Sequence, residues 1–125
     1  MAEKKLSFAI FGNDRRALDS IRIWEILNYL TKREAEIYIE ETFYNNLVRE
    51  LHEELCISGV FEGSNFDADY AISMGGDGTF LRAASKVGAK NIPIIGVNMG
   101  RLGFLANILP SEILSMLDEI YAGNF

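Results

Sequence analysis

The chain has 125 residues, 49% of them hydrophobic and 24% charged, which is typical of one domain with a buried core and excludes a disordered chain. The formal net charge of −6 argues against a basic nucleic-acid surface, and the single cysteine, Cys56, excludes a disulfide framework or a cysteine-rich metal site. No apolar stretch approaches the roughly 20 residues that span a bilayer, so we expect a cytoplasmic protein that binds neither nucleic acid nor membranes.

The first half of the chain predicts a strand, a helix, a strand, a helix and a loop in turn. The segments are 6–13, 18–30, 35–41, 43–55 and 59–68. Both helices show apolar residues at helical spacing. The first has a broad apolar face, which is either buried against the sheet or a subunit interface, and Asp14 is its candidate cap. The segment 35–41 alternates apolar and acidic residues, so we expect a strand near a sheet edge with its acidic side chains in solvent.

The second half continues the alternation. The segments are a strand at 69–74, a helix at 79–87, a strand at 92–97, a short strand at 102–107 and a helix from 110 to 123. The last helix has a proline in its first turn and a glycine at its end, as helices often do. Strands that alternate with helices, without tight hairpin turns between them, predict an α/β fold. We expect a three-layer, mostly parallel, Rossmann-like sheet with helices on both faces.

Two glycine-rich loops follow strands of this sheet, at Gly75–Thr79 and at Asn98–Gly103. Ligands of such sheets bind beyond the carboxyl ends of the strands. In the first loop, backbone N–H groups and the dipole of the following helix favour an anion. Its three glycines allow backbone conformations closed to bulkier residues and let a ligand approach without meeting a Cβ, and Thr79 is placed to cap the helix. The loop is not a P-loop, because Thr-Phe follows its last glycine, and it lacks the dinucleotide fingerprint.

The aspartate inside this loop, Asp77, carries most of the chemical information. A carboxylate beside a phosphate is unfavourable: two like charges about 4 Å apart cost roughly 4 kcal/mol at an effective dielectric near 20. Either Mg²⁺ carried by a nucleotide offsets this repulsion, or the aspartate accepts the proton of a substrate hydroxyl during phosphoryl transfer. Both explanations indicate a kinase. The alternative is that Asp77 only caps the helix or forms an Asx-turn.

The sequence Gly-Gly-Asp-Gly-Thr at 75–79 resembles the first motif of the NAD kinases. It also resembles that of the diacylglycerol and sphingosine lipid kinases and, more loosely, the phosphofructokinases. The stretch Gly96–Leu105 is similar to the NAD kinases in particular, in which a strand, Asn, Gly and Leu-Gly-Phe-Leu follow in this order. The resemblance covers Asp69 to Phe125 and implies a phosphofructokinase-like N-terminal domain.

The resemblance implies an enzyme that phosphorylates the 2′-hydroxyl of the adenosine ribose of NAD with ATP or polyphosphate to give NADP, with Mg²⁺ or another divalent cation carried by the nucleotide. Asp77 would engage the ribose hydroxyl and support its phosphorylation. The residues expected to shape the substrate sites are Gly75, Gly76, Gly78, Thr79, Asn98, Gly100, Arg101 and Phe104. The first motif would face phosphate and the second would border the dinucleotide pocket, although Phe104 suits a core position equally well. Arg101 and Arg82 either contact phosphate or are exposed, and no residue is assigned as a resident metal ligand.

The sequence departs from the family in one respect. NAD kinases continue into a second, β-rich domain that carries an Asn-Glu or Asn-Asp pair and a Thr-Pro-Thr-Gly-Ser-Thr-Ala-Tyr stretch, and neither occurs in this chain. We therefore expect residues 1–125 to be an N-terminal domain that is inactive alone, and the full-length protein to be a homo-oligomer. Two alternatives stay open: a lipid kinase domain that shares the first motif, and a non-catalytic nucleotide-binding or assembly module.

Overall fold

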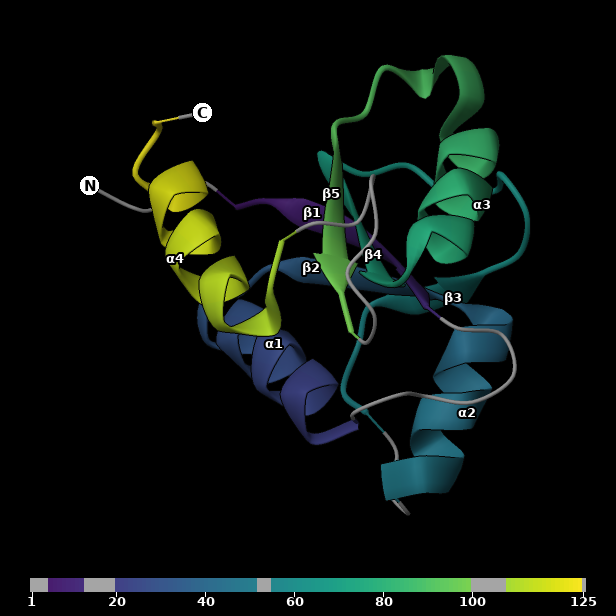
Figure 1. The fold of residues 1–125 in the computed structure, drawn as a ribbon, viewed down its shortest axis with the longest axis horizontal. Coiled ribbons are helices and arrows are strands. Elements are labelled where there is room, and N and C mark those ends of the chain that lie inside the picture. The colour runs from purple at the N-terminus through teal and green to yellow at the C-terminus, as the bar shows by residue number, and fades with distance from the viewer. Residues whose placement is uncertain (1–4, 13–19, 52–54, 100–107, 125) are drawn as a thin grey trace.

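The computed structural model of the chain describes residues 5–12, 20–51, 55–99 and 108–124 (Figure 1). They form a five-stranded sheet of order β3-β2-β1-β4-β5, and all four strand pairings are parallel. The strands are β1 (Ser7–Gly12), β2 (Glu36–Glu40), β3 (Gly59–Phe61), β4 (Tyr70–Gly75) and β5 (Ile94–Asn98). The helices are α1 (Ser20–Lys32), α2 (Glu41–Leu51), α3 (Asp77–Val87) and α4 (Pro110–Tyr121). The predicted α/β fold with a parallel sheet is confirmed.

The helices cover both faces of the sheet, because successive side chains of each strand point to opposite sides. In β1, Phe8 and Ile10 belong to a core cluster that includes residues of α1, α2 and α4. Ala9 and Phe11 belong to a second cluster, which includes Ala83 of α3. Figure 1 shows α1 and α4 together on one side of the sheet and α3 on the other. The predicted three-layer arrangement is therefore confirmed.

The sheet has one strand that the sequence did not predict. β3 is only three residues long, lies in the segment expected to be a loop, and pairs with Tyr38–Glu40 of β2. Three residues are too few to show a period-2 pattern, and Val60 in their middle is exposed. Because β3 forms the edge, β2 pairs on both sides, and the expectation that β2 lies near the edge with its acidic residues in solvent is wrong for Glu40, which is buried.

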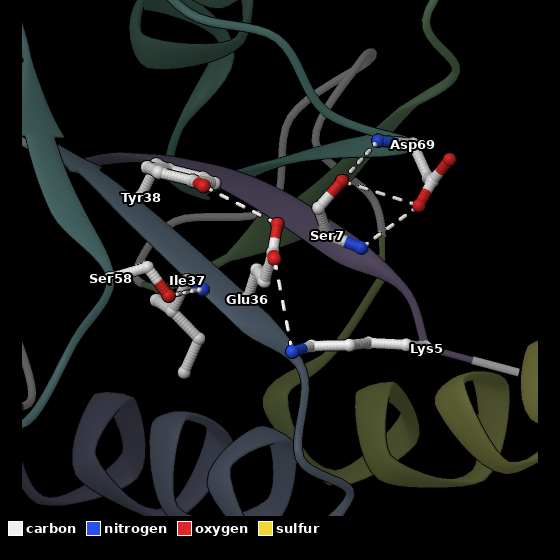
Figure 2. Close-up of polar contacts among 7 residues, drawn as sticks. All are labelled: Lys5, Ser7, Glu36, Ile37, Tyr38, Ser58 and Asp69. Atoms are coloured by element: carbon white, nitrogen blue, oxygen red, sulfur yellow. Dashed lines mark hydrogen bonds and ion pairs between the residues drawn. The ribbon is translucent and has the colours of Figure 1, made fainter. Parts of the chain in front are cut away.

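The amino-terminal end of the sheet is held by polar contacts (Figure 2). The Asp69 carboxylate accepts hydrogen bonds from the backbone N–H of Ser7 at 2.9 Å and from its hydroxyl at 3.2 Å. In return, the backbone N–H of Asp69 donates to the Ser7 hydroxyl at 3.0 Å. Glu36 of β2 accepts a hydrogen bond from the Tyr38 hydroxyl and forms an ion pair with Lys5 at 3.8 Å. These contacts align the starts of β1, β2 and β4 at the end of the sheet opposite the glycine-rich motif.

The outer helices begin and end largely as predicted. Pro110 occupies the first turn of α4, where Glu112 accepts a hydrogen bond from the backbone N–H of Leu109 at 2.9 Å. The broad face of α1 is only partly buried, since Ile21 and Trp24 are exposed. The candidate cap Asp14 and the predicted strand at 102–107 lie outside the described residues. Among the helices that the structure describes, none has both the length and the apolar character needed to cross a membrane.

Candidate functional site

The glycine-rich motif lies at the point where the direction of strand addition reverses. β1 leads through α1 to β2 on one side of the sheet, whereas its other neighbour, β4, leads through α3 to β5. Gly12, Gly75 and Asn98 are the last residues of β1, β4 and β5, so their chain ends meet at one edge. Ligands of open parallel sheets bind beyond the carboxyl ends of the strands at such a switch point. The fold therefore brings the first motif and Asn98, the start of the second, to one edge of the sheet.

The first turn of α3 is built from the motif itself. Gly76 is the N-cap, and Asp77, Gly78 and Thr79 are the first three helical residues. The first backbone hydrogen bond of the turn runs from the N–H of Phe80 to the carbonyl of Gly76 at 3.1 Å. The N–H groups before it have no acceptor within a helix, and together with the helix dipole they form an anion-binding end.

The helix begins two residues earlier than the sequence predicts, and Thr79 does not cap it. No side chain makes a capping hydrogen bond at Gly76. Thr79 is instead buried at the third helical position. A Cβ on Gly75 would lie 2.5 Å from Oγ1 and 2.9 Å from Cβ of Thr79. Thr79 therefore packs the helix directly onto the end of β4, and the expected capping role is corrected to a packing role.

Glycine occupies the three positions of the motif for different physical reasons. Gly75, Gly76 and Gly78 are all described by the structure and none has a positive φ, so the expectation that they adopt conformations closed to other residues is wrong. Gly76 has φ −121° and ψ −161°, an extended conformation open to any residue. Gly75 is required by the contact with Thr79. A Cβ on Gly76 or Gly78 would meet no other group of the described residues within 4 Å, which agrees with the expectation that these two leave room for a ligand.

Asp77 is partly exposed at the first position of α3. A carboxylate in the first turn of a helix is stabilised by the dipole, typically by about 0.3–1 kcal/mol. The isolated domain can therefore hold this charge without strain, and the repulsion discussed above arises only when a phosphate arrives. Because Gly76 is the N-cap, Asp77 is not the capping residue of α3, whereas its half-exposed position in the first turn allows a catalytic role.

The start of the second motif is joined to the first by the backbone. Asn98 is paired in register with Gly75, and the N–H of Met99 donates to the carbonyl of Gly75 at 2.9 Å. The N–H of Asn98 donates to the carbonyl of Ile108 at 2.7 Å. Asn98 is only 2% exposed, so it is a buried polar residue at the end of β5. The other predicted residues of this motif, Gly100, Arg101 and Phe104, lie outside the described residues.

Arg82 of α3 makes a contact that the sequence analysis did not anticipate. One of its terminal nitrogens lies 2.6 Å from Oε1 of Glu40, and its Nε lies 3.4 Å from Oε2 of the same carboxylate. The terminal nitrogen also donates to the carbonyl of Gly12. Arg82 is not plainly exposed, because its side chain is only 27% exposed and is paired with Glu40, whereas its contact with phosphate stays a prediction. Since 42 residues separate Arg82 from Glu40, no local sequence pattern could have indicated the pair.

A charged hollow of about 270 Å³ lies beside this ion pair. Its lining includes Glu40, Arg82 and Lys86 together with Glu41 of α2 and Glu62, which follows β3. A hydrogen bond between the carboxyl groups of Glu62 and Glu41, followed by their charge repulsion, raises the pKa of Glu41 above its ordinary value. The hollow thus combines cationic side chains with a carboxyl pair that favours holding a proton.

The described residues contain no group of three or more His, Cys, Asp or Glu side chains that could hold a metal ion. Mg²⁺ does not require such a group, because it is usually bound by one or two carboxylates together with substrate phosphates and waters. The described residues therefore suit a divalent cation that arrives bound to a nucleotide. Asp77 is the carboxylate of the 75–79 motif that could contact such a cation.

Comparisons with known proteins agree with this geometry. The model of the ATP-NAD kinase N-terminal domain matches residues 8–125. The chain is 43% identical over 120 residues to the NAD kinase of Bacteroides fragilis strain YCH46, which covers 96% of this chain and 41% of that protein. It is 37% identical over 117 residues to the NAD kinase of Porphyromonas gingivalis strain W83, which covers 94% and 41%.

A solved structure is similar in fold. The crystal structure of yeast NADH kinase complexed with NADH superposes with a TM-score of 0.70 at 18% identity, covering 94% of this chain and 38% of that one. At this identity the likeness supports the fold alone. The chain spans about 41% of the length of the curated relatives named above. The match to the domain model over 8–125, with the relatives' identities, shows that the chain belongs to the NAD kinase family and corresponds to its N-terminal domain.

Proposed function

We propose that this chain is the N-terminal domain of an NAD kinase whose full-length protein transfers the terminal phosphate of ATP or polyphosphate to the 2′-hydroxyl of the adenosine ribose of NAD. The observation that carries the proposal is the placement of Asp77 on the first turn of α3, at the switch point of the sheet and between two glycines with open surroundings. Family membership supports the choice of NAD over a lipid as the substrate.

In this proposal, Asp77 accepts the proton of the ribose hydroxyl as its oxygen attacks the terminal phosphorus. A new oxygen–phosphorus bond forms, and the bond from that phosphorus to the rest of the donor breaks. A carboxylate positioned against a hydroxyl performs this role in phosphoryl transfer. The N–H groups of the first turn of α3 orient phosphate oxygens, and the missing Cβ atoms of Gly76 and Gly78 let the substrate approach the backbone.

A divalent cation would enter with the donor and neutralise the charge of its phosphates. Asn98 would support the first motif, since it is buried at the end of β5 and is paired there with Gly75 of β4. Gly100, Arg101 and Phe104 stay predictions as residues that border the dinucleotide pocket. Homo-oligomer formation and a cytoplasmic location also stay predictions from the sequence.

The isolated chain is proposed to be nearly inactive. It spans about 41% of the length of its relatives, and the β-rich domain that the family resemblance implies would complete the NAD site. We expect weak NAD binding and negligible NADP formation by residues 1–125. Substantial NADP formation by this chain would show that it contains a complete site.

The test is an assay of the full-length protein with labelled ATP, Mg²⁺ and either NAD or diacylglycerol. We expect label in NADP and none in lipid. Label in the lipid would favour the lipid kinase alternative, and label in neither product, with the protein folded, would favour a non-catalytic nucleotide-binding module.

A further inference from the structure

The ion pair between Arg82 and Glu40 connects three elements at the carboxyl edge of the sheet. Arg82 lies on α3, Glu40 is the last residue of β2, and the carbonyl that Arg82 also contacts belongs to Gly12, the last residue of β1. The side chain of Arg82 is 27% exposed and that of Glu40 is 11% exposed. A single guanidinium thus joins the helix that carries Asp77 to the strands on the far side of the switch point.

Each end of this connection is fixed by close packing. A Cβ on Gly12 would collide with the ring of Phe43, so the end of β1 lies tightly against α2. On the other side, Thr79 fills the space beside Gly75 and fixes the first turn of α3 on β4. Arg82 follows Thr79 by three residues, about one helical turn. The guanidinium therefore adds a direct contact between α3 and the end of β1, which pairs with β4 from Phe8 to Gly12.

We propose that Arg82 is a positioning residue of the phosphoryl-transfer site, and that Glu40 holds it in place. The inference rests on the proposed function, in which Asp77 must reach the ribose hydroxyl while the helix end meets phosphate. In this role Arg82 acts through the orientation of α3 and not through contact with the substrate. Its planar guanidinium donates to the Glu40 carboxylate through two nitrogens while one of them also reaches the Gly12 carbonyl, a geometry that the single ammonium of lysine cannot reproduce.

The chain offers a matched control. Arg33 forms an ion pair with Asp118 at 3.1 Å, and its side chain is 31% exposed, close to the value for Arg82. Arg33 directly follows the last residue of α1, so this pair joins the end of α1 to α4, remote from the switch point, because α1 runs from the carboxyl edge toward the amino end of the sheet. Arg33→Lys therefore disturbs a comparable contact without touching α3.

The experiment compares wild type, Arg82→Lys, Glu40→Gln, the double variant of these two substitutions and Arg33→Lys in the full-length protein. Steady-state kinetics with NAD and ATP give kcat and KM, and urea unfolding gives the midpoint. We expect Arg82→Lys to lower kcat by up to about 100-fold, because a misplacement of the catalytic group by about 1 Å can reduce the rate this much. KM for NAD and the unfolding midpoint should change no more than they do in Arg33→Lys. Glu40→Gln should behave like Arg82→Lys, and the double variant should lose little more than the worse single one, because the two residues act as a unit.

Hydrogen exchange separates this inference from the proposed function. The amide of Phe80, which bonds the carbonyl of Gly76, should exchange faster in Arg82→Lys than in wild type and be unchanged in Arg33→Lys. Unchanged exchange and unchanged kcat in Arg82→Lys would overturn the inference. So would a loss of kcat no larger than that of Arg33→Lys. If wild type forms no NADP, the proposed function fails, and faster exchange at Phe80 would still support the positioning of α3 by Arg82, whereas unchanged exchange would end it.

Discussion

Thr79 occupies the space that a side chain on Gly75 would need. The Oγ1 atom of Thr79 lies 2.5 Å from the position of a Cβ on Gly75, and its Cβ lies 2.9 Å from it. We expect Gly75→Ala to lower the free energy of unfolding by about 1–3 kcal/mol, the usual cost of overpacking. Urea unfolding followed by circular dichroism measures this, and a variant as stable as wild type would show that α3 can move away from β4 without cost.

Substitution of the two other glycines of the motif should not destabilise the fold. Gly78 lies in the first turn of α3, and a Cβ there meets no other group of the described residues within 4 Å. Gly78→Ala should raise the free energy of unfolding by about 0.5–1 kcal/mol, because alanine favours the helix. Gly76→Ala should leave it nearly unchanged. Both substitutions should raise the KM values for NAD and ATP in the full-length protein, since the added methyl group occupies the space through which the substrates are proposed to approach. Unchanged KM values would place the ligand elsewhere.

Removing the charge of Asp77 should abolish most catalysis without loss of structure. Asp77→Asn should lower kcat by about 100- to 10,000-fold, the range for a positioned acid or base, while the residue's partial exposure at the end of α3 leaves the core untouched. NADP formation by the full-length protein measures it. Asp67→Asn is the control, because Asp67 is an exposed aspartate in the segment between β3 and β4. Undiminished turnover in Asp77→Asn would refute the assigned role.

The hydroxyl of Ser73 in β4 is fully buried and has no hydrogen-bond partner among the described residues. A buried polar group without a partner costs about 1–3 kcal/mol, so Ser73→Ala should raise the free energy of unfolding by about 1 kcal/mol. Ser58→Ala is the comparison, at an exposed serine whose hydroxyl does have a hydrogen-bond partner. Its hydroxyl accepts a hydrogen bond from the N–H of Ile37 at 3.1 Å (Figure 2), so its loss should destabilise. Destabilisation by Ser73→Ala would indicate a partner outside the described residues or an ordered water.

The carboxyl pair of Glu41 and Glu62 should make stability depend on pH. The hydrogen bond with Glu62 raises the pKa of Glu41 in the folded state above its ordinary value of 4.5. The folded state therefore binds this proton more tightly, and the resulting stability is present below pH 4.5 and lost as the pH rises through the raised pKa. Glu62→Gln should be more stable than wild type at pH 7, and this advantage should vanish at low pH.

Unfolding across this pH range, with Glu50→Gln on the exposed side of α2 as the control, measures the effect. An equal pH dependence of wild type and Glu62→Gln would show that the two carboxyl groups do not interact.

The periodic parts of the fold were predictable from the sequence, and the parts that depend on distant pairing were not. The apolar runs of β1, β4 and β5 and the helical spacing of α1, α2 and α4 are local patterns, and they predicted the parallel sheet with helices on both faces. β3 was missed because three residues carry too little pattern. The Arg82–Glu40 pair was missed because its members lie on different elements.

The motif at 75–79 was located from the sequence, but the reasons why each of its residues is needed were only partly predictable. Its strand-to-helix position follows from the flanking apolar patterns. Whether a glycine is needed for its backbone conformation or for a close neighbour depends on φ and on packing, which a sequence does not contain. Thus Gly75 was expected to serve a special backbone conformation and Thr79 to cap the helix, whereas the two residues pack against each other.

The position of β1 in the sheet has a consequence for synthesis on the ribosome. β1 is the first of the five described strands in chain order, but it is central and pairs with β4, and the Ser7–Asp69 contact just before β4 spans 62 residues. At a rate of synthesis of about 5–20 residues per second, β1 emerges roughly 3–12 seconds before β4, the second strand with which it pairs. During this interval the nascent chain exposes an unpaired, Phe- and Ile-rich strand edge, and such edges are prone to aggregate.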